Sequence, residues 1–291
     1  LGQYFPFQMP SLFGIPPTGV WTIILLAYAF IASVLPVTTL LQPRDYLNAI
    51  QLYIALALIV VGIIVAAFTL DLNITAPAIN MHPQGAPPIF PFLFITLACG
   101  AISGFHSLVA SGTSSKQIST EADAKFIGYG AMLIEAMLAT IVVIAVSAGL
   151  SLAYTSKTGE VLQGLAAWQV HYSSWDASSG LASKLQAVVI GGSNFISSLG
   201  ISKEFGIILL GVFIASFAGT TLDSATRVQR YIITELFSKT KFKFFANKWI
   251  ATGLAIISAG ILAFSSGTAG KGALVLWPIF GCVNQLLAGL T

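Results

Sequence analysis

Long apolar runs alternate with shorter polar connections along most of this chain. A membrane-spanning helix needs about 20 consecutive apolar residues, and the pattern predicts seven such spans. Their approximate bounds are residues 20–41, 48–70, 90–112, 126–152, 204–237, 249–265 and 272–291, and Pro36 interrupts the first of them. Residues 186–199 are too short and too rich in glycine to predict a span. The predicted fold class is all-α, a polytopic helical membrane protein.

Composition supports this class. Charged residues make up 8% of the 291 positions and hydrophobic residues 56%, and the mean hydropathy is +0.88. A soluble domain usually carries about 25% charged residues, so a soluble globular protein is excluded. The lipid bilayer is therefore an expected partner. The net charge of +3 is small, and we expect no nucleic-acid partner.

The ends of the chain and its basic residues predict its organisation. The chain starts without an initiator Met and stops at Thr291 inside an apolar run, so we interpret residues 1–291 as a single transmembrane domain and a fragment of a longer polypeptide. Missing helices of the same polypeptide are then expected partners. If residues 186–199 do not cross, 9 of the 13 basic residues share one side. The positive-inside rule makes that side cytoplasmic and makes residues 155–200 an external loop with a re-entrant or surface helix.

The run from Cys99 to Ser119 places polar groups inside an apolar stretch. On a continuous helix, one face would carry Ser103, His106, Ser107, Ala110, Ser111 and Ser114. Such a stripe is costly at bilayer depth unless it meets protein, water or a ligand. Gly100 and Gly104 form a Gly-x-x-x-Gly step, which is typical of close helix packing or of a discontinuous helix that binds a substrate or an ion. The density of Gly, Ser and Thr favours an interruption near Gly104.

Two titratable side chains inside apolar runs each allow two interpretations. His106 is either a hydrogen-bonded core histidine or a substrate contact or proton relay. Glu135 lies about a third of the way into the fourth span, where an unpaired carboxylate costs several kcal/mol. It is either a structural hydrogen-bond partner of a neighbouring helix or a proton carrier.

Further polar residues lie in or beside the other spans. Asp223 and Arg227 have the i,i+4 spacing of a helix-supporting ion pair, and Thr220 and Thr221 offer oxygens to a small cation. Arg44 and Asp45 are interpreted as a local ion pair in a cytoplasmic turn over residues 42–48. Asn284 and Gln285 are interpreted either as partners in interhelical hydrogen bonds or as gate residues.

The motifs of common enzymes are missing from the sequence. It contains no His-Glu-x-x-His, no Gly-x-Ser-x-Gly and no phosphate loop. We therefore predict no enzyme activity, no catalytic residues, no metal site and no cofactor. H+ and Na+ both stay open as a coupling ion, and the oligomeric state is not predicted.

Five ordered segments resemble the carbon starvation protein A family. They are Leu40–Asn48, Gly100–Thr113, Ile127–Glu135, Thr220–Tyr231 and Leu276–Leu287. The resemblance implies a secondary transporter, multi-pass in the bacterial inner membrane, that takes up peptides or pyruvate and is driven by protons. It also implies kinship with the amino acid–polyamine–cation superfamily and a partial LeuT-type five-plus-five inverted-repeat fold.

In that fold, residues 90–112 would be one of two broken helices, and Thr220–Thr221 would lie on the helix where sodium-coupled relatives hold a cation. The family's earlier glycine-rich helix would precede residue 1.

The combined interpretation is a transporter of small carboxylate-bearing nutrients that works by alternating access. The predicted substrate-binding residues are Ser103, Gly104, Phe105, His106, Ser107 and Ser111. The predicted ion-coupling residues are Thr220, Thr221, Asp223 and Glu135. The alternatives are a membrane-embedded enzyme that uses His106 with Ser107 or Ser111, and a nutrient sensor with a carrier fold. Peptide and pyruvate are not distinguished.

Overall fold

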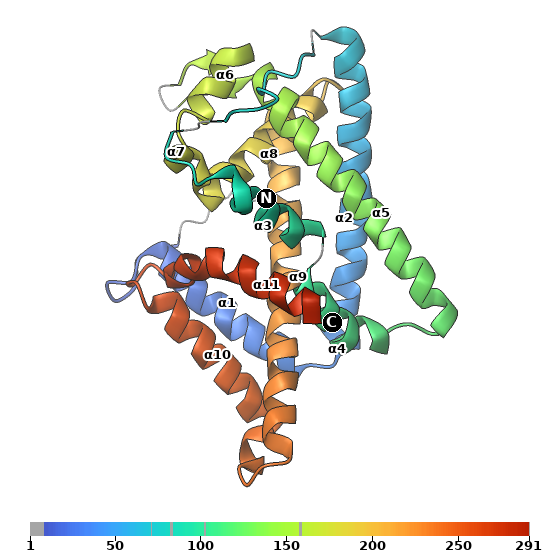
Figure 1. The fold of residues 1–291 in the computed structure, drawn as a ribbon, viewed down its shortest axis with the longest axis vertical. Coiled ribbons are helices and arrows are strands. Elements are labelled where there is room, and N and C mark those ends of the chain that lie inside the picture. The colour runs from blue at the N-terminus through green and yellow to red at the C-terminus, as the bar shows by residue number, and fades with distance from the viewer. Residues whose placement is uncertain (1–8, 71, 82–83, 102, 157–158, 291) are drawn as a thin grey trace. The chain divides into compact units, whose positions relative to one another are not determined.

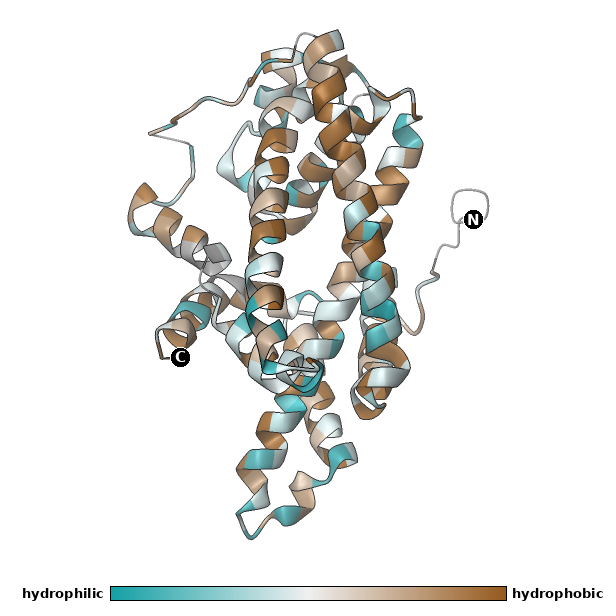
Figure 2. Ribbon diagram, turned by 90° about the vertical axis from the view of Figure 1, so that its right-hand side faces the viewer, coloured by the Kyte–Doolittle hydropathy of each residue, from teal (hydrophilic) through white to brown (hydrophobic). Residues whose placement is uncertain are grey.

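The computed structural model describes residues 9–70, 72–81, 84–101, 103–156 and 159–290, most of them in helices (Figure 1). Among these residues, four helices are long and apolar enough to cross a membrane, and hydrophobic residues cover most of the long helices in Figure 2. They are α1 (Pro17–Val34), α2 (Val37–Thr69), α5 (Glu121–Ile144) with its continuation to Leu152, and α9 (Lys203–Ser238). The prediction of an all-α, polytopic membrane protein is confirmed.

The other elements are shorter. The remaining α-helices are α3 (Ile89–Ala101), α4 (Gly104–Gly112), α6 (Gly164–His171), α7 (Trp175–Ser179), α8 (Leu181–Ser197), α10 (Lys248–Phe264) and α11 (Trp277–Leu290). Single turns are η1 (Ser114–Lys116), the π-helical η2 (Ala145–Gly149), η3 (Leu150–Leu152), η4 (Lys243–Ala246) and η5 (Gly272–Leu276). Strands β1 (Tyr154–Thr155) and β2 (Val161–Leu162) pair antiparallel. The predicted spans at 90–112, 249–265 and 272–291 are thus short or divided helices.

The first predicted span ends where Pro36 interrupts it, as expected. Leu35 is extended (φ −66°, ψ 153°), α1 stops at Val34 and α2 starts at Val37. Proline lacks an N–H and disfavours helical backbone in the residue before it. The predicted turn over residues 42–48 is wrong, however. These residues, including Pro43, lie within α2, because the apolar helix continues through the Gln-Pro-Arg-Asp sequence that suggested a turn.

The chain divides into two compact units. The first comprises Leu1–Asp45, Phe90–Ile118 and Gly219–Thr291, and the second comprises Tyr46–Ile89 and Ser119–Ala218. Helices α2 and α9 therefore each contribute residues to both units. The break between α3 and α4, α10 and α11 belong to the first unit, and α5 to α8 belong to the second.

Close backbone approach holds α8 in the second unit. A Cβ on Gly191 would overlap the backbone of Ala145, and a Cβ on Gly62 would overlap the backbone of Phe195. The buried Asn194 side chain donates to the Gly149 carbonyl oxygen at 2.8 Å. Residues 186–199 are predicted not to span and to form a re-entrant or surface helix, and they lie largely in α8. Gly191 and Gly192 do not break this helix but are buried inside it, because glycines at a helix interface allow the backbones to touch.

A buried histidine in the second unit predicts a pH effect on stability. His171 is 5% exposed, and its Nδ1 and Nε2 lie 3.4 Å from the hydroxyls of Tyr154 and Ser183. Burial lowers the pKa of the His171 imidazole. The folded state therefore binds this proton less readily than the unfolded state, whose histidine has a pKa near 6.5. Stability from His171 is present above about pH 6.5 and is lost as the pH falls below it.

We expect the melting temperature of the purified protein to fall between pH 7.5 and pH 5.5. The His171→Gln variant, whose side chain does not titrate, should show a smaller fall over the same interval. Equal falls in the two proteins would contradict this role of His171.

Candidate functional site

An interruption divides the polar segment of the first unit into two helices. Helix α3 ends at Ala101, Ser103 is extended (φ −91°, ψ 114°), and α4 begins at Gly104. The predicted interruption near Gly104 is confirmed. The first amides of α4 have no carbonyl one turn earlier to bond to, so the break leaves N–H groups for other partners.

Asn284 of α11 occupies part of this break. Its Oδ1 accepts from the Phe105 amide at 2.6 Å, and its Nδ2 donates to the Ser103 hydroxyl at 3.2 Å. Asn284 is buried, which confirms an interhelical hydrogen bond at this position. A Cβ on Gly104 would lie 2.6 Å from the Ala288 backbone nitrogen, whereas a Cβ on Gly100 would meet nothing described within 4 Å. Of the Gly-x-x-x-Gly pair, Gly104 alone packs against a described helix.

The remaining predicted substrate residues lie on α4. His106 is exposed and forms no hydrogen bond with a described residue. The neighbouring Phe105 is half-buried. The Ser107 hydroxyl donates to the Gly104 carbonyl at 2.7 Å, and the Ser111 hydroxyl donates to the Leu108 carbonyl at 3.1 Å. His106 is thus the side chain of this group with a free donor.

The predicted polar face is shorter than expected. Ser103 lies in the break, and Ser114 begins the turn η1 rather than continuing α4. The helical part of the stripe is therefore limited to His106, Ser107, Ala110 and Ser111. The expectation failed because it assumed one continuous helix through a segment that divides.

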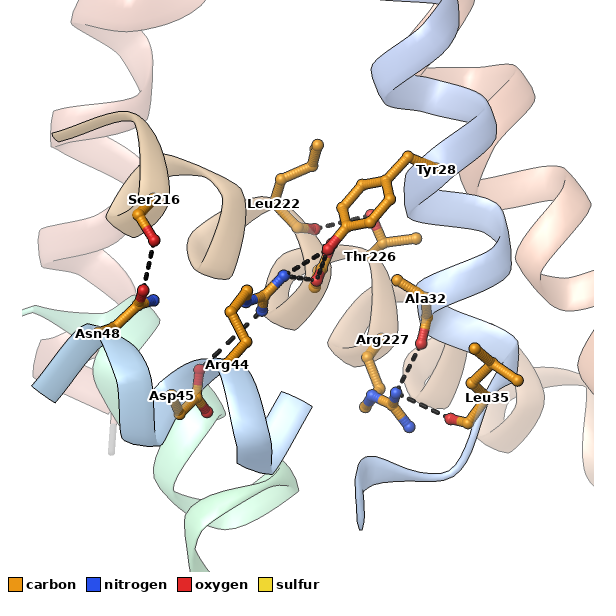
Figure 3. Close-up of polar contacts among 11 residues, drawn as sticks. Tyr28, Ala32, Leu35, Arg44, Asp45, Asn48, Ser216, Leu222, Thr226 and Arg227 are labelled. Carbon is orange, nitrogen blue, oxygen red and sulfur yellow. Dashed lines mark hydrogen bonds and ion pairs between the residues drawn. The ribbon is translucent and has the colours of Figure 1, made fainter. Parts of the chain in front are cut away.

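A second polar group joins α1, α2 and α9 (Figure 3). Asp223 of α9 is fully buried, and its Oδ2 accepts from the Tyr28 hydroxyl at 3.0 Å and forms an ion pair with Arg44 Nη1. Arg44 Nη1 also donates to the Tyr28 oxygen at 2.6 Å. The Asp45 carboxylate lies 4.0 Å from Arg44 Nη2 and is hydrogen-bonded by Thr220. We call Tyr28, Arg44, Asp45 and Asp223 the charge cluster.

The expected pair between Asp223 and Arg227 is replaced by other contacts. Arg227 Nη2 donates to the Ala32 carbonyl at 2.8 Å and to the Leu35 carbonyl at 3.0 Å (Figure 3). The last carbonyls of a helix lack intrahelical partners and favour a cation. The carbonyl groups at the end of α1 therefore accept hydrogen bonds from Arg227, and Asp223 pairs with Arg44. Arg44 lies in a helix and not in the expected turn; the local pair with Asp45 is present at 4.0 Å, and Asp223 is a second, long-range partner.

Arg44 and Tyr28 are the residues that the sequence interpretation missed as members of a site. A buried carboxylate in an apolar span needs a cation, and Arg44 is one of few near a span, so this signal was present. Tyr28 gave no signal because a tyrosine in an apolar run is ordinary.

The other ion-coupling candidates are placed separately. Thr220 is half-buried and Thr221 is exposed on α9. Glu135 lies on α5 in the second unit, is exposed, and has no hydrogen-bonding or ionic partner among the described residues. In the described part of the chain, no three His, Cys, Asp or Glu side chains are grouped as a metal site.

Comparison with known proteins gives consistent matches. The model of the family described as carbon starvation protein CstA matches residues 2–291. Peptide transporter CstA of Helicobacter pylori (strain ATCC 700392 / 26695) is 32% identical, covering 100% of this chain and 45% of its own length. The same-named protein of Escherichia coli K12 is 33% identical, over 94% of this chain and 44% of its own length.

Pyruvate/proton symporter BtsT of Escherichia coli K12 is 30% identical, over 92% of this chain and 45% of its own length. The chain therefore spans less than half the length of these relatives. No solved structure matches it.

Proposed function

The chain belongs to the carbon starvation protein CstA family, and on that premise we propose that it is part of a proton-coupled secondary transporter for small carboxylate-bearing nutrients. Its apolar helices and bacterial relatives make it a multi-pass protein of the bacterial inner membrane. The relatives are named for peptide transport and for pyruvate/proton symport, which fits a protein that is not an enzyme. These names support peptides or pyruvate as the substrate and H+ as the coupling ion.

The observation that carries the proposal is the break between α3 and α4. Irregular backbone at membrane depth is tolerated where it is buried in protein or lines a water-filled cavity, and carriers use half-helix ends to hold ionic substrate groups. The start of α4 offers amides and the exposed His106 side chain as donors to a carboxylate. We assign substrate binding to Ser103, Gly104, Phe105, His106, Ser107 and Ser111.

The remaining parts of the proposal follow from the same premise. We assign ion coupling to Thr220, Thr221 and Asp223, with Glu135 as a second candidate. The transporter works by alternating access, and this chain is one transmembrane domain of a LeuT-type five-plus-five repeat whose other helices lie elsewhere in the polypeptide. Residues 155–200 form its external loop.

The proposal is tested with the full-length protein reconstituted in liposomes. Labelled pyruvate and a labelled dipeptide are offered with and without an inward proton gradient. We expect the gradient to drive accumulation of at least one of them above its external concentration. Substrate binding without counterflow would instead indicate a nutrient sensor, and chemical conversion of the substrate would indicate an enzyme.

His106 gives a residue-level prediction. If its ring donates to a substrate carboxylate, His106→Ala removes a hydrogen bond to a charged group, worth about 1.5–3 kcal/mol. We expect roughly tenfold weaker substrate binding or more, with little change in melting temperature because the ring is exposed. His106→Gln keeps a side-chain N–H donor and should retain more affinity. Unchanged affinity in His106→Ala would remove this residue from the site.

A further inference from the structure

The charge cluster holds one more carboxylate than cations. Asp45 is faced by Arg44 on its own helix, and by Asp223 and Thr220 on α9. Tyr28 of α1 contacts Arg44 and Asp223 as a neutral hydroxyl. Arg227, one turn along α9 from Asp223, is engaged by the α1 carbonyls. With both carboxylates ionised the cluster carries a net charge of −1, and an uncompensated charge in a membrane protein is costly. One bound proton makes the cluster neutral.

The two carboxylates differ in how firmly each is held as an anion. Asp223 is 0% exposed, and one of its oxygens receives both the Tyr28 hydroxyl and the Arg44 guanidinium. Donors and an adjacent cation both favour an ionised carboxylate. Asp223 is therefore the carboxylate that anchors the Arg44 guanidinium, through Oδ2 alone, since its buried Oδ1 has no hydrogen-bond partner.

Asp45 is held more loosely, by one Thr220 hydrogen bond and a long ion pair. The nearest Arg44 nitrogen is 4.0 Å away, too far for a hydrogen bond, and the Asp45 side chain is 41% exposed. Its Oδ1 is shielded and has no hydrogen-bond partner, and Arg44 Nε and Nη2 likewise have none. The guanidinium thus has donors without a hydrogen bond beside a carboxylate that it contacts only as a long ion pair.

We propose that Asp45 is the residue that carries the coupled proton. When Asp45 is protonated, Arg44 is hydrogen-bonded to Asp223 and lies at the longer separation of 4.0 Å from Asp45. When Asp45 releases the proton, its anion draws the free Arg44 donors toward it, and the guanidinium is shared between two carboxylates. The proton therefore sets how tightly α2 is tied to α9 within the first unit. This inference rests on the proposed proton-coupled transport and names the residue that performs it, with Asp223 anchoring Arg44.

The test separates coupling from substrate movement in the full-length protein. Asp45→Asn is reconstituted beside the wild type, Asp45→Glu and the control Glu235→Gln, which alters an exposed α9 carboxylate. Labelled pyruvate and a dipeptide are measured in counterflow and under a proton gradient. We expect Asp45→Asn to keep counterflow and lose gradient-driven accumulation. Asp45→Glu should retain both to a measurable degree, and Glu235→Gln should behave as wild type.

Two results overturn the assignment. The first is gradient-driven accumulation by Asp45→Asn at the wild-type level, and the second is loss of counterflow in an Asp45→Asn protein that melts like wild type. If the wild type itself shows no gradient-driven accumulation, the proposed function fails, which is a different outcome.

A measurement on the unmodified protein does not depend on the folding of a variant. Carbodiimides react with protonated carboxyl groups in apolar surroundings. We expect mass spectrometry to find the adduct of dicyclohexylcarbodiimide on Asp45, with less adduct as the pH is raised. Adduct formation on Asp223 in place of Asp45 would reverse the roles and overturn the proposal.

Discussion

Replacing Asp223 with alanine is expected to remove a large part of the stability of the folded protein. Asp223 is fully buried and pairs with Arg44, whose side chain is 18% exposed. Removing one member of a buried ion pair leaves the other charge unpaired and typically costs about 3–5 kcal/mol, against a total stability of roughly 5–15 kcal/mol. The melting temperature in detergent and the folded fraction in size-exclusion chromatography measure the loss. Glu235→Ala, at an exposed site on the same helix, is the control.

The double variant Arg44→Met/Asp223→Leu should be more stable than Asp223→Ala. It leaves no member of the pair unpaired, and apolar replacements of buried ion pairs are often neutral or stabilising. A double-mutant cycle built from the single and double replacements would show strong coupling between residues 44 and 223. Additive effects would mean that the pair does not interact in the folded protein.

The second large effect is expected from Gly104→Ala. The added Cβ would lie 2.6 Å from the Ala288 backbone nitrogen and 2.7 Å from the Leu287 Cβ, and these atoms cannot move without shifting α11. Overpacking of this kind costs about 1–3 kcal/mol, and contact with backbone places Gly104→Ala at the upper end. The melting temperature should fall accordingly.

Gly100→Ala is the matched control for this prediction. A Cβ there meets no described atom within 4 Å, and alanine is favoured over glycine inside a helix by about 0.5–1 kcal/mol. Its melting temperature should be unchanged or slightly higher. If both substitutions lowered it equally, both glycines would be packing positions, and the distinction drawn between them would be wrong.

Hydropathy and backbone chemistry were enough to predict much of the fold. The apolar runs predict α2, α5 and α9, Pro36 predicts the end of α1, and the glycines and hydroxyls around Gly104 predict the break before α4. These features are encoded locally. At Gly191 the glycine content was taken as a reason against a regular span, whereas the structure shows this glycine at a helix-packing position.

The composition of the charge cluster was beyond such reasoning. Asp223 has Arg227 four residues away and Arg44 179 residues away, and spacing alone favours the near partner. Which arginine pairs with Asp223 depends on where the free carbonyl groups at the end of α1 lie. These carbonyls accept hydrogen bonds from Arg227, so Asp223 pairs with Arg44. The break at Gly104 was predictable, but its partner Asn284 was predicted only to make some interhelical contact.

The contacts of Arg227 also determine how the joint between α1 and α2 can move. Pro36 has no N–H, so no regular helical ladder crosses this joint, and Arg227 supplies hydrogen bonds to the Ala32 and Leu35 carbonyls from a side chain. A change of angle at this joint requires release of that guanidinium and of the hydrogen bond from Arg44 of α2 to Tyr28 of α1, while the helical hydrogen bonds on either side stay intact. Arg227 of α9, one turn from Asp223, therefore stabilises the angle between α1 and α2. Its hydrogen bonds can be lost without unfolding either helix.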